Sequence, residues 1–269
     1  MKKILALLLA LSMALGLAAC SGQDGKESDN SGDSDLAYIQ EKGTLVVGIT
    51  EFEPMDYTDA DGNWIGFDAD MARAFAESLG VEAQFQVIAD WDSKVMELEG
   101  KTVDVVWNGM TLTEDVLTAM ECSNPYFSNG QVVIVPADKA GDYQTEESLA
   151  DLQFAVENGS AGQEELDRLG YSYTPVQDQA TALMEVAAGT SDAAVVDYLM
   201  AAAMTGEGTS YEDLAYTVQL NSEEYGVGFR KGSDLAEAFN TFWEAAYADG
   251  TVMTAAETYG VQESLIEPD

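Results

Sequence analysis

The sequence predicts an α/β fold with mostly parallel sheets and helices on both faces of each sheet. Short β-branched runs alternate with stretches of helical periodicity, and this alternation occurs as two series, one after the other. About 230 residues follow position 35, a length sufficient for one large domain or two modest lobes. These observations point to mostly parallel sheets in either one large domain or two modest lobes.

In the first series, apolar and β-branched runs predict the strands, whereas periodic spacing predicts the helices. A helix over 68–79 places Met71, Phe75 and Leu79 on one face, and Gly80 follows as a stop signal. Strict alternation of apolar and polar residues marks the second strand. Strands are expected at 44–49, 81–88, 103–107 and 131–135, and short helices around 93–99 and after the capping residue Thr113.

The second series repeats this order. A long helix capped by Ser233 and ending at Ala248 directs Leu235, Phe239, Phe242 and Ala246 inward, and Gly250 ends it. The remaining elements are expected as strands at 153–156, 193–196, 215–218 and 225–229 and as helices at 163–169 and 178–188. Ligands of α/β sheets bind beyond the carboxyl ends of the strands. The loops to inspect are therefore 50–57, 108–113 and 157–162, together with Asp197.

The first 19 residues are typical of an export signal. Lys2 and Lys3 precede an apolar run that ends in Leu17-Ala18-Ala19-Cys20, and this run is too short for a membrane span. The cysteine after Leu-Ala-Ala resembles the lipobox of bacterial lipoproteins, which implies cleavage before Cys20 and lipidation of its sulfur. The alternative is an ordinary secretory signal with a chance cysteine.

Residues 20–35 contain almost nothing to bury, so we expect a flexible tether between the lipid and the folded part. Two or more acyl chains give a stable anchor. The protein is therefore expected on the extracytoplasmic face of the cell membrane, lipid-anchored and monomeric.

Composition excludes several classes of function. The chain has 49 acidic and 11 basic residues, for a net charge of −38, which disfavours nucleic acid as a partner. It has no histidine, and Cys122 is the only cysteine besides Cys20, which excludes an internal disulfide in the mature chain, a Cys/His metal site and Ser-His-Asp catalysis. No metal or cofactor is expected, and the role of Cys122 stays open.

Five blocks in order carry a family resemblance. Residues 45–80 are followed by TVDVVWNGMTLT (102–113), CSNPYF (122–127), SDAAVVD (191–197) and EYGVGFRKGS (224–233). Together they resemble family 3 extracellular solute-binding proteins, the receptors of amino-acid ABC importers. That resemblance implies a periplasmic-binding-protein-like clamshell that closes on its ligand and passes it to a permease. It implies lobe 1 at 36–129 and 220–269, and lobe 2 at 130–219.

The resemblance also implies the ligand-binding residues. Two aromatic side chains, Phe52 and Trp91, are expected to sandwich the ligand, with Tyr57 as a further candidate. Asn108, Gly109 and Thr111 belong to a turn that binds the main-chain polar groups of the ligand. The turn of Gly159, Ser160 and Ala161 offers helix N-terminal N–H groups to a carboxylate, and Asp197 pairs with the α-ammonium.

One departure from the family pattern bears on the ligand. The family usually has an arginine that grips the α-carboxylate, and Val116 occupies that position here. Glu157 stands where the family can have lysine. Carboxylates beside aromatic faces suit a cation. We therefore expect amines or other cationic solutes to bind more tightly than glutamate, aspartate or simple neutral amino acids, although α-amino acids are not excluded.

Two other functions fit the same fold. A dehydratase could use a pair of carboxylates for acid–base chemistry, drawn from Glu51, Glu53, Asp56, Glu157 and Asp197. A ligand sensor would normally be fused to a membrane span and an output module. No specific motif supports either, so the sequence predicts a binding protein rather than an enzyme.

Overall fold

The computed structural model describes residues 34–268, which form one compact unit. The predicted signal peptide and Cys20 lie outside the described residues, as does most of the predicted tether. Folded structure begins slightly earlier than expected, because Ser34 caps the first helix, α1 (Asp35–Lys42), and its side chain accepts a hydrogen bond from the N–H of Ala37. Asp35 pairs with Arg230, so it belongs to the folded part rather than to the tether.

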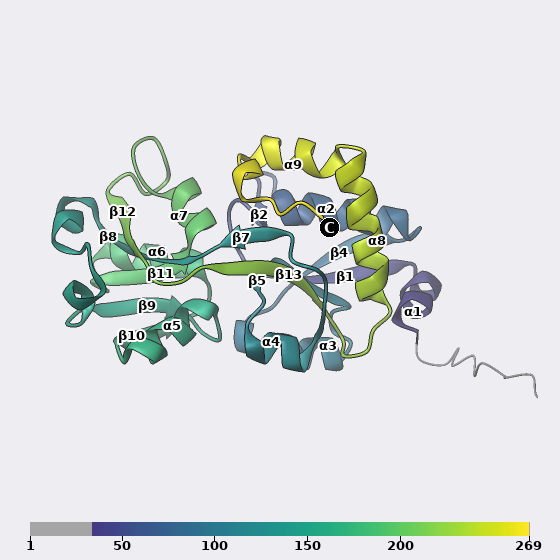
Figure 1. Cartoon of the computed structure of the whole chain (residues 1–269), viewed down its shortest axis with the longest axis horizontal. Coiled ribbons are helices and arrows are strands. Elements are labelled where there is room, and N and C mark those ends of the chain that lie inside the picture. Colours follow the sequence, from purple (N-terminus) through teal and green to yellow (C-terminus); the bar gives the residue numbers. More distant parts are fainter. Residues whose placement is uncertain (1–33, 269) are drawn as a thin grey trace, which may run out of the picture. The chain divides into compact units, whose positions relative to one another are not determined.

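Two sheets divide this unit into the two lobes seen side by side in Figure 1. In lobe 1 the strand order is β4 (Glu82–Val87), β1 (Thr44–Ile49), β5 (Val105–Thr111), β13 (Glu223–Phe229) and β6 (Glu121–Cys122), with β7 (Phe127–Asn129) also paired to β13. In lobe 2 it is β10 (Ser172–Val176), β9 (Gln153–Glu157), β11 (Ala193–Asp197), β8 (Gln131–Pro136) and β12 (Leu214–Gln219). A separate hairpin joins β2 (Tyr57–Thr58) to β3 (Trp64–Ile65).

The sheets are mixed. Pairs β1–β4, β1–β5, β9–β10 and β9–β11 are parallel, as the alternating pattern predicts. The strands on either side of the lobe crossings, β8, β12 and β13, pair antiparallel to their neighbours. The chain enters lobe 2 from β7 to β8 and returns from β12 to β13, so both connections pass through one narrow region.

Helices cover both sheets. Lobe 1 carries α1, α2 (Phe67–Ser78), α3 (Lys94–Glu99), α4 (Glu114–Ala119), α8 (Leu235–Ala248) and α9 (Thr251–Tyr259); lobe 2 carries α5 (Ala161–Leu169), α6 (Gln179–Ala188) and α7 (Tyr198–Met204). Short 3₁₀ turns lie at η1 (Trp91–Ser93), η2 (Ala137–Asp142), η3 (Glu146–Leu149) and η4 (Gln262–Ser264). No helix among the described residues has the length and apolarity needed to cross a bilayer.

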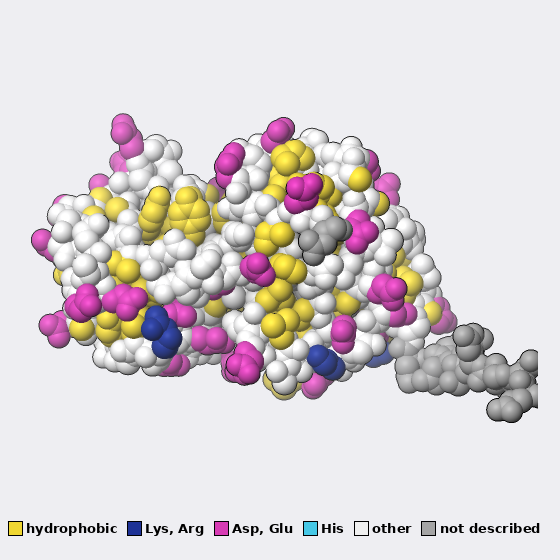
Figure 2. All heavy atoms as spheres, viewed as in Figure 1, with side chains coloured by type: hydrophobic (Ala, Val, Ile, Leu, Met, Phe, Trp, Pro, Cys, Tyr) yellow, Lys and Arg dark blue, Asp and Glu magenta, His cyan; other side chains and the backbone are white. Residues whose placement is uncertain are grey.

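The core of lobe 1 is an aromatic cluster under α8. The ring of Trp107 meets that of Phe239 at 4.9 Å, and Phe239 stacks on Trp243 at 5.6 Å. Such contacts add to the free energy gained by burying large apolar surfaces. Acidic side chains are spread over the face drawn in Figure 2, with few basic ones among them.

Several sequence expectations need correction. Residues 108–111, expected as a turn, are the end of β5, because they continue its pairing with β13. The long helix begins at Leu235 rather than after a Ser233 cap, and its buried face contains Trp243, whereas Phe242 is half-buried. The elements that were not predicted include the helices α1, α7 and α9 and the strands β2, β3, β6, β7 and β10.

Candidate functional site

A narrow cleft lies between the lobes, with an accessible volume of about 30 Å³ within about 420 Å³ of unfilled space that includes open solvent. Strand ends and helix starts supply its walls, as expected for an α/β sheet. The residues of lobe 1 that line the cleft are Trp91, Lys94, Asn108, Gly109, Met110, Thr111, Thr113 and Val116. Those of lobe 2 are Gln131, Glu157, Gly159, Ser160, Ala161, Glu164, Gln179 and Asp197.

Eight of the ten predicted ligand-binding residues line this cleft, and Phe52 and Tyr57 do not. Phe52 is buried beneath Gly109, where a Cβ atom on that glycine would come within 2.4 Å of the Phe52 ring. Tyr57 lies on β2 with its ring edge-on to Tyr259 at 6.4 Å. A direct ligand contact for these two aromatic residues stays a prediction.

The floor of the cleft in lobe 1 is held by hydrogen bonds from residues beneath it. Asn108 exchanges two hydrogen bonds with Thr50: the Thr50 N–H donates to Oδ1 at 2.9 Å, and Nδ2 donates to the hydroxyl at 2.7 Å. Gly109 has a φ of 55°, in the left-handed region that glycine tolerates. Its N–H donates to the buried carboxylate of Asp68 at 2.6 Å. The strand end is therefore fixed before any ligand arrives.

Asp68 belongs to a buried acidic pair that does not line the cleft. The hydroxyl of Tyr126 donates to it at 2.8 Å, and burial raises the pKa of Asp68 to about 7. Asp56 is fully buried nearby, and neither of its carboxylate oxygens has a hydrogen-bond partner in the described chain. Burial and the neighbouring Asp68 raise the pKa of Asp56 well above its usual range.

A second acidic group lies at the end of β11, on the lobe 2 wall. Asp197 is 3 % exposed and accepts hydrogen bonds from three amides: Asn129 at 2.5 Å, Gln131 at 2.8 Å, and Gln179. Asn129 and Gln131 also donate to Glu223, at 2.7 and 2.8 Å. Because Asn129, Gln131 and Glu223 lie where the chain crosses between lobes, the network ties Asp197 to the crossing segments. Burial and the neighbouring Glu223 raise the pKa of Asp197.

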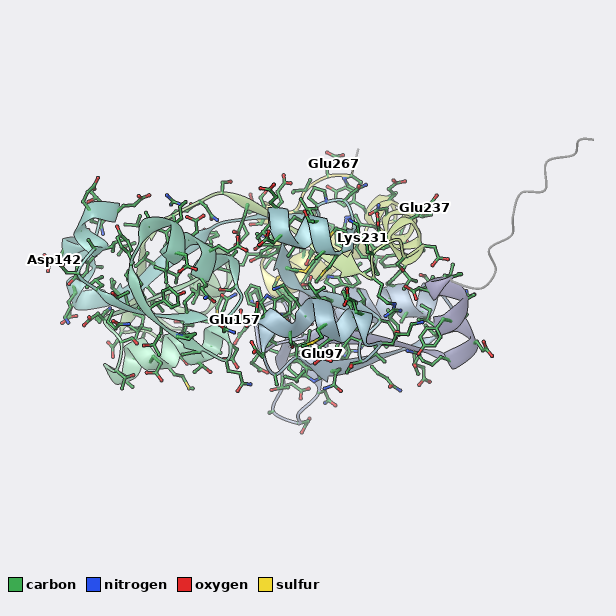
Figure 3. The ribbon with its side chains drawn as sticks, turned by 90° about the horizontal axis from the view of Figure 1, so that it is seen from below. Glu97, Asp142, Glu157, Lys231, Glu237 and Glu267 are labelled. Atoms are coloured by element: carbon green, nitrogen blue, oxygen red, sulfur yellow. The ribbon has the colours of Figure 1, made fainter. Side chains whose placement is uncertain are left out.

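Glu157 ends β9 beside this network and is 3 % exposed. Figure 3 shows it where lobe 2 faces lobe 1. Its Oε1 atom has no hydrogen-bond partner within the described residues. Burial, with the nearby Asp197 and Asp178, raises the pKa of Glu157 to about 8. A buried carboxyl with an unused oxygen facing a cleft is suited to accept hydrogen bonds from a cationic ligand.

Helix α5 begins at the same wall. The Ser160 side chain caps it by accepting the N–H of Gln163 at 3.2 Å. The N–H groups of Ala161 and Gly162, in the first turn, have no intrahelical acceptor. This end of the helix can accept negative charge.

Sequence reasoning did not assign a role to Lys94, the first residue of α3. It is 8 % exposed, and its Nζ donates to the carbonyl oxygens of Trp91 at 3.3 Å and Gly159 at 3.1 Å. Its burial at a helix start was the missing information, since lysine at such a position is usually solvated. Gln179, also missed, reaches Asp197 because Asp178 caps α6 there.

Contacts near the cleft mouth join the two lobes in this conformation. Besides the Lys94–Gly159 hydrogen bond, Asn158 Nδ2 donates to Asp90 Oδ1 at 2.9 Å. Gly159 packs so tightly against Asp92 that a Cβ would lie 2.6 Å from the Asp92 Cα. The loop before α5 therefore closes directly onto η1.

Two α/β lobes whose strand ends line a polar cleft are typical of a two-lobe binding protein. Comparisons with known proteins identify its family. The model of "Bacterial extracellular solute-binding proteins, family 3" matches residues 45–262. The L-cystine-binding protein TcyJ of Escherichia coli is 29% identical over 255 residues, covering 93% of this chain and 94% of TcyJ. The arginine-binding extracellular protein ArtP of Bacillus subtilis is 30% identical over 250 residues, covering 89% of this chain and 91% of ArtP.

Solved structures show a similar fold. A crystal structure of a mutant of ArgBP from T. maritima superposes with a TM-score of 0.78 at 31% identity, covering 84% of this chain and 98% of ArgBP. The chain belongs to the family 3 bacterial extracellular solute-binding proteins. The two-lobe α/β fold expected from the sequence is confirmed, as is the family.

Proposed function

We propose that this protein is the receptor of an ABC importer and binds an amino acid or a related cationic amine between its lobes. The observation that carries the proposal is the pair Glu157 and Asp197, two buried carboxyls in the cleft, one with an oxygen that no protein group uses. A ligand cation would replace the missing partner and offset the desolvation of both acids. Trp91 also lines this cleft, with the Lys94 ammonium 5.2 Å from the centroid of its ring.

The test is a thermal-shift screen of amino acids and amines, followed by calorimetry of each hit. A ligand at 100 times its dissociation constant stabilises the folded state by about 2.7 kcal/mol. We expect cationic compounds among the hits and no binding of glutamate or aspartate. A protein stabilised by no amino acid or amine, or only by glutamate and aspartate, would contradict the proposed ligand class.

Delivery to a permease is the second part of the proposal. Ligand contacts both lobes only when the cleft is closed, so binding favours the closed form. We expect the radius of gyration in solution scattering to fall on ligand addition. An unchanged radius with saturating ligand would contradict the clamshell mechanism, and reconstituted uptake with the cognate permease would test delivery.

Lipid anchoring through Cys20 is the third part, and it rests on the Leu17-Ala18-Ala19-Cys20 sequence. A monomeric receptor anchored by lipid would stay near its importer while the tether lets it turn. The mature protein should partition into detergent and begin at a modified Cys20. If Cys20→Ser remains membrane-bound at the normal mature mass, this part is wrong.

Acid–base catalysis is the second candidate function, because the raised pKa of Glu157 suits a general acid near neutral pH. Incubation of each hit with the protein separates the two functions. Recovery of the unchanged ligand supports binding, and formation of a dehydrated product supports an enzyme.

A further inference from the structure

Lys94 is a buried cation without an anionic partner. The described chain forms several ion pairs, but none of them includes Lys94. Its ammonium group has three N–H donors, and two of them reach backbone carbonyls of Trp91 and Gly159. The Trp91 ring, with its centroid 5.2 Å from Nζ, and nearby acids such as Asp92 and Glu157 attract this charge, but no carboxylate bonds to it directly. One donor remains for a group inside the cleft that Lys94 lines.

On its other side, the same cleft holds an acidic side chain with an oxygen atom that has no hydrogen-bond partner in the described residues. Glu157 of lobe 2 also lines the cleft, and its Oε1 is unpartnered, yet Lys94 and Glu157 form no ion pair. Electrostatically each acts on the other, since Lys94 counteracts the rise in the pKa of Glu157. A basic group and an acidic group that line one cleft without bonding to each other can each bind one end of a dipolar ligand.

Lys94 and the start of α5 supply positive charge at one place in the cleft, beside the acid Glu164, which also lines it. The start of α5, with the N–H groups of Ala161 and Gly162, borders the same part of the cleft as Gly159. Val116 lines the cleft on the lobe 1 side and provides no charge. Lys94 is therefore the only basic side chain that lines the cleft within residues 34–268.

We infer that Lys94 is the cationic partner of a carboxylate on the ligand and makes the cleft select amino acids over the corresponding amines. This inference rests on the proposed function and refines the ligand class expected from the sequence. The ammonium end of the ligand lies at Glu157 and Asp197. The carboxylate of the ligand lies between Lys94 and the start of α5. A second positive charge on the ligand would be attracted by the acidic side chains of the cleft.

Matched pairs of probes test the inference, because decarboxylation removes only the group that Lys94 would bind. Calorimetry is carried out with L-arginine and agmatine, L-histidine and histamine, and L-cystine and cystamine. In the wild-type protein, the amino acid of each bound pair should bind about thirtyfold or more tightly than its amine, the effect of leaving a buried charge unpaired.

Three variants separate charge from folding. Lys94→Met keeps the aliphatic stem and should remove the preference for the amino acid, while amine affinity changes less than threefold. Lys94→Arg keeps the charge and should keep the preference. Lys139→Met alters an exposed lysine of lobe 2 and should change neither affinity.

The outcomes also separate the two proposals. If an amine binds the wild-type protein as tightly as its amino acid, the inference is wrong and the proposed function stands. If Lys94→Met weakens both members of a pair equally, Lys94 acts through closure onto Gly159 and the inference is wrong. If no probe of the panel binds the wild-type protein, the proposed function fails, and the inference fails with it.

Discussion

Two pairs of buried acids have similar electrostatics but different surroundings. Asp56 and Asp68 lie beneath the floor of lobe 1, and Glu157 and Asp197 lie on the lobe 2 wall of the cleft. In both pairs burial and a neighbouring acid raise at least one pKa. Only the second pair lines a space that a ligand can enter. A raised pKa therefore identifies a candidate site only when the carboxyl also faces a cleft.

The largest expected effect on ligand affinity comes from a change in the pair of acids that lines the cleft. Asp197→Ala removes a desolvated partner of the ligand cation and should weaken binding about thirtyfold or more in calorimetry. The three amides that donate to Asp197 would lose their acceptor, so the thermal unfolding curve must show that the variant is folded. Affinity within threefold of the wild type would remove Asp197 from the site.

The second prediction tests whether ligand binding at Glu157 and Asp197 depends on closure of the lobes. In Gly159→Ala the new Cβ would meet the backbone of Asp92, so we expect affinity to fall about tenfold because the closed form becomes strained. Gly170→Ala is the matched control at the other end of α5. Its φ is +72°, against +71° at Gly159, but nothing lies within 4 Å of its Cβ position.

Both alanine variants should lose about 1 kcal/mol of unfolding free energy, because both force a left-handed backbone. Only Gly159→Ala should also weaken ligand binding and enlarge the radius of gyration with ligand present. Equal affinities for the two variants would show that the contact between Gly159 and Asp92 plays no part in closure.

The smallest expected effect on ligand affinity concerns Asp56 and Asp68, the acidic pair beneath the floor of lobe 1. Asp68→Asn keeps the shape, can still accept the N–H of Gly109, and removes the charge. We expect ligand affinity within threefold of the wild type. The pKa of Asp68 is about 7 in the folded state and lower when unfolded, so the wild-type fold loses stability as the pH rises towards 7, and the loss levels off above pH 7.

The stability of the wild type should therefore fall between pH 5 and pH 8, and Asp68→Asn should fall less over the same range. Urea unfolding at the two pH values measures this difference. Identical pH dependence in the two proteins would contradict the assigned pKa.

Much of the architecture could be predicted from sequence. Alternating β-branched and helical segments indicated the α/β class, and strand-end positions brought Trp91, Asn108 and Asp197 to one cleft. The sequence did not reveal that Asn108–Thr111 continue β5, because their backbone bonds go to β13, more than a hundred residues away. It missed Lys94 for a similar reason, since the burial of that side chain depends on Gly159 from the other lobe.

Phe52 illustrates the limit of strand-end reasoning. It follows β1 as expected, yet Gly109 covers its ring, and it supports the cleft floor from below. Position along a strand indicates the edge of the sheet but not the depth of the side chain.

The most direct test of the central claim is the release of protons when ligand binds. The claim is that a ligand cation takes the place of protons on Glu157 and Asp197. Glu157, with a pKa of about 8, is mostly protonated at pH 7.4 in the empty cleft, and a cation favours its ionised form. Affinity should therefore rise from pH 6 to pH 8.

L-arginine is the probe, titrated by calorimetry at pH 7.4 in phosphate and in Tris, two buffers with different heats of ionisation. The wild type should give different binding enthalpies in the two buffers, which shows proton release. Glu157→Gln should give a clearly smaller difference. Binding of L-arginine with the same enthalpy in both buffers, in wild type and variant alike, would contradict the account.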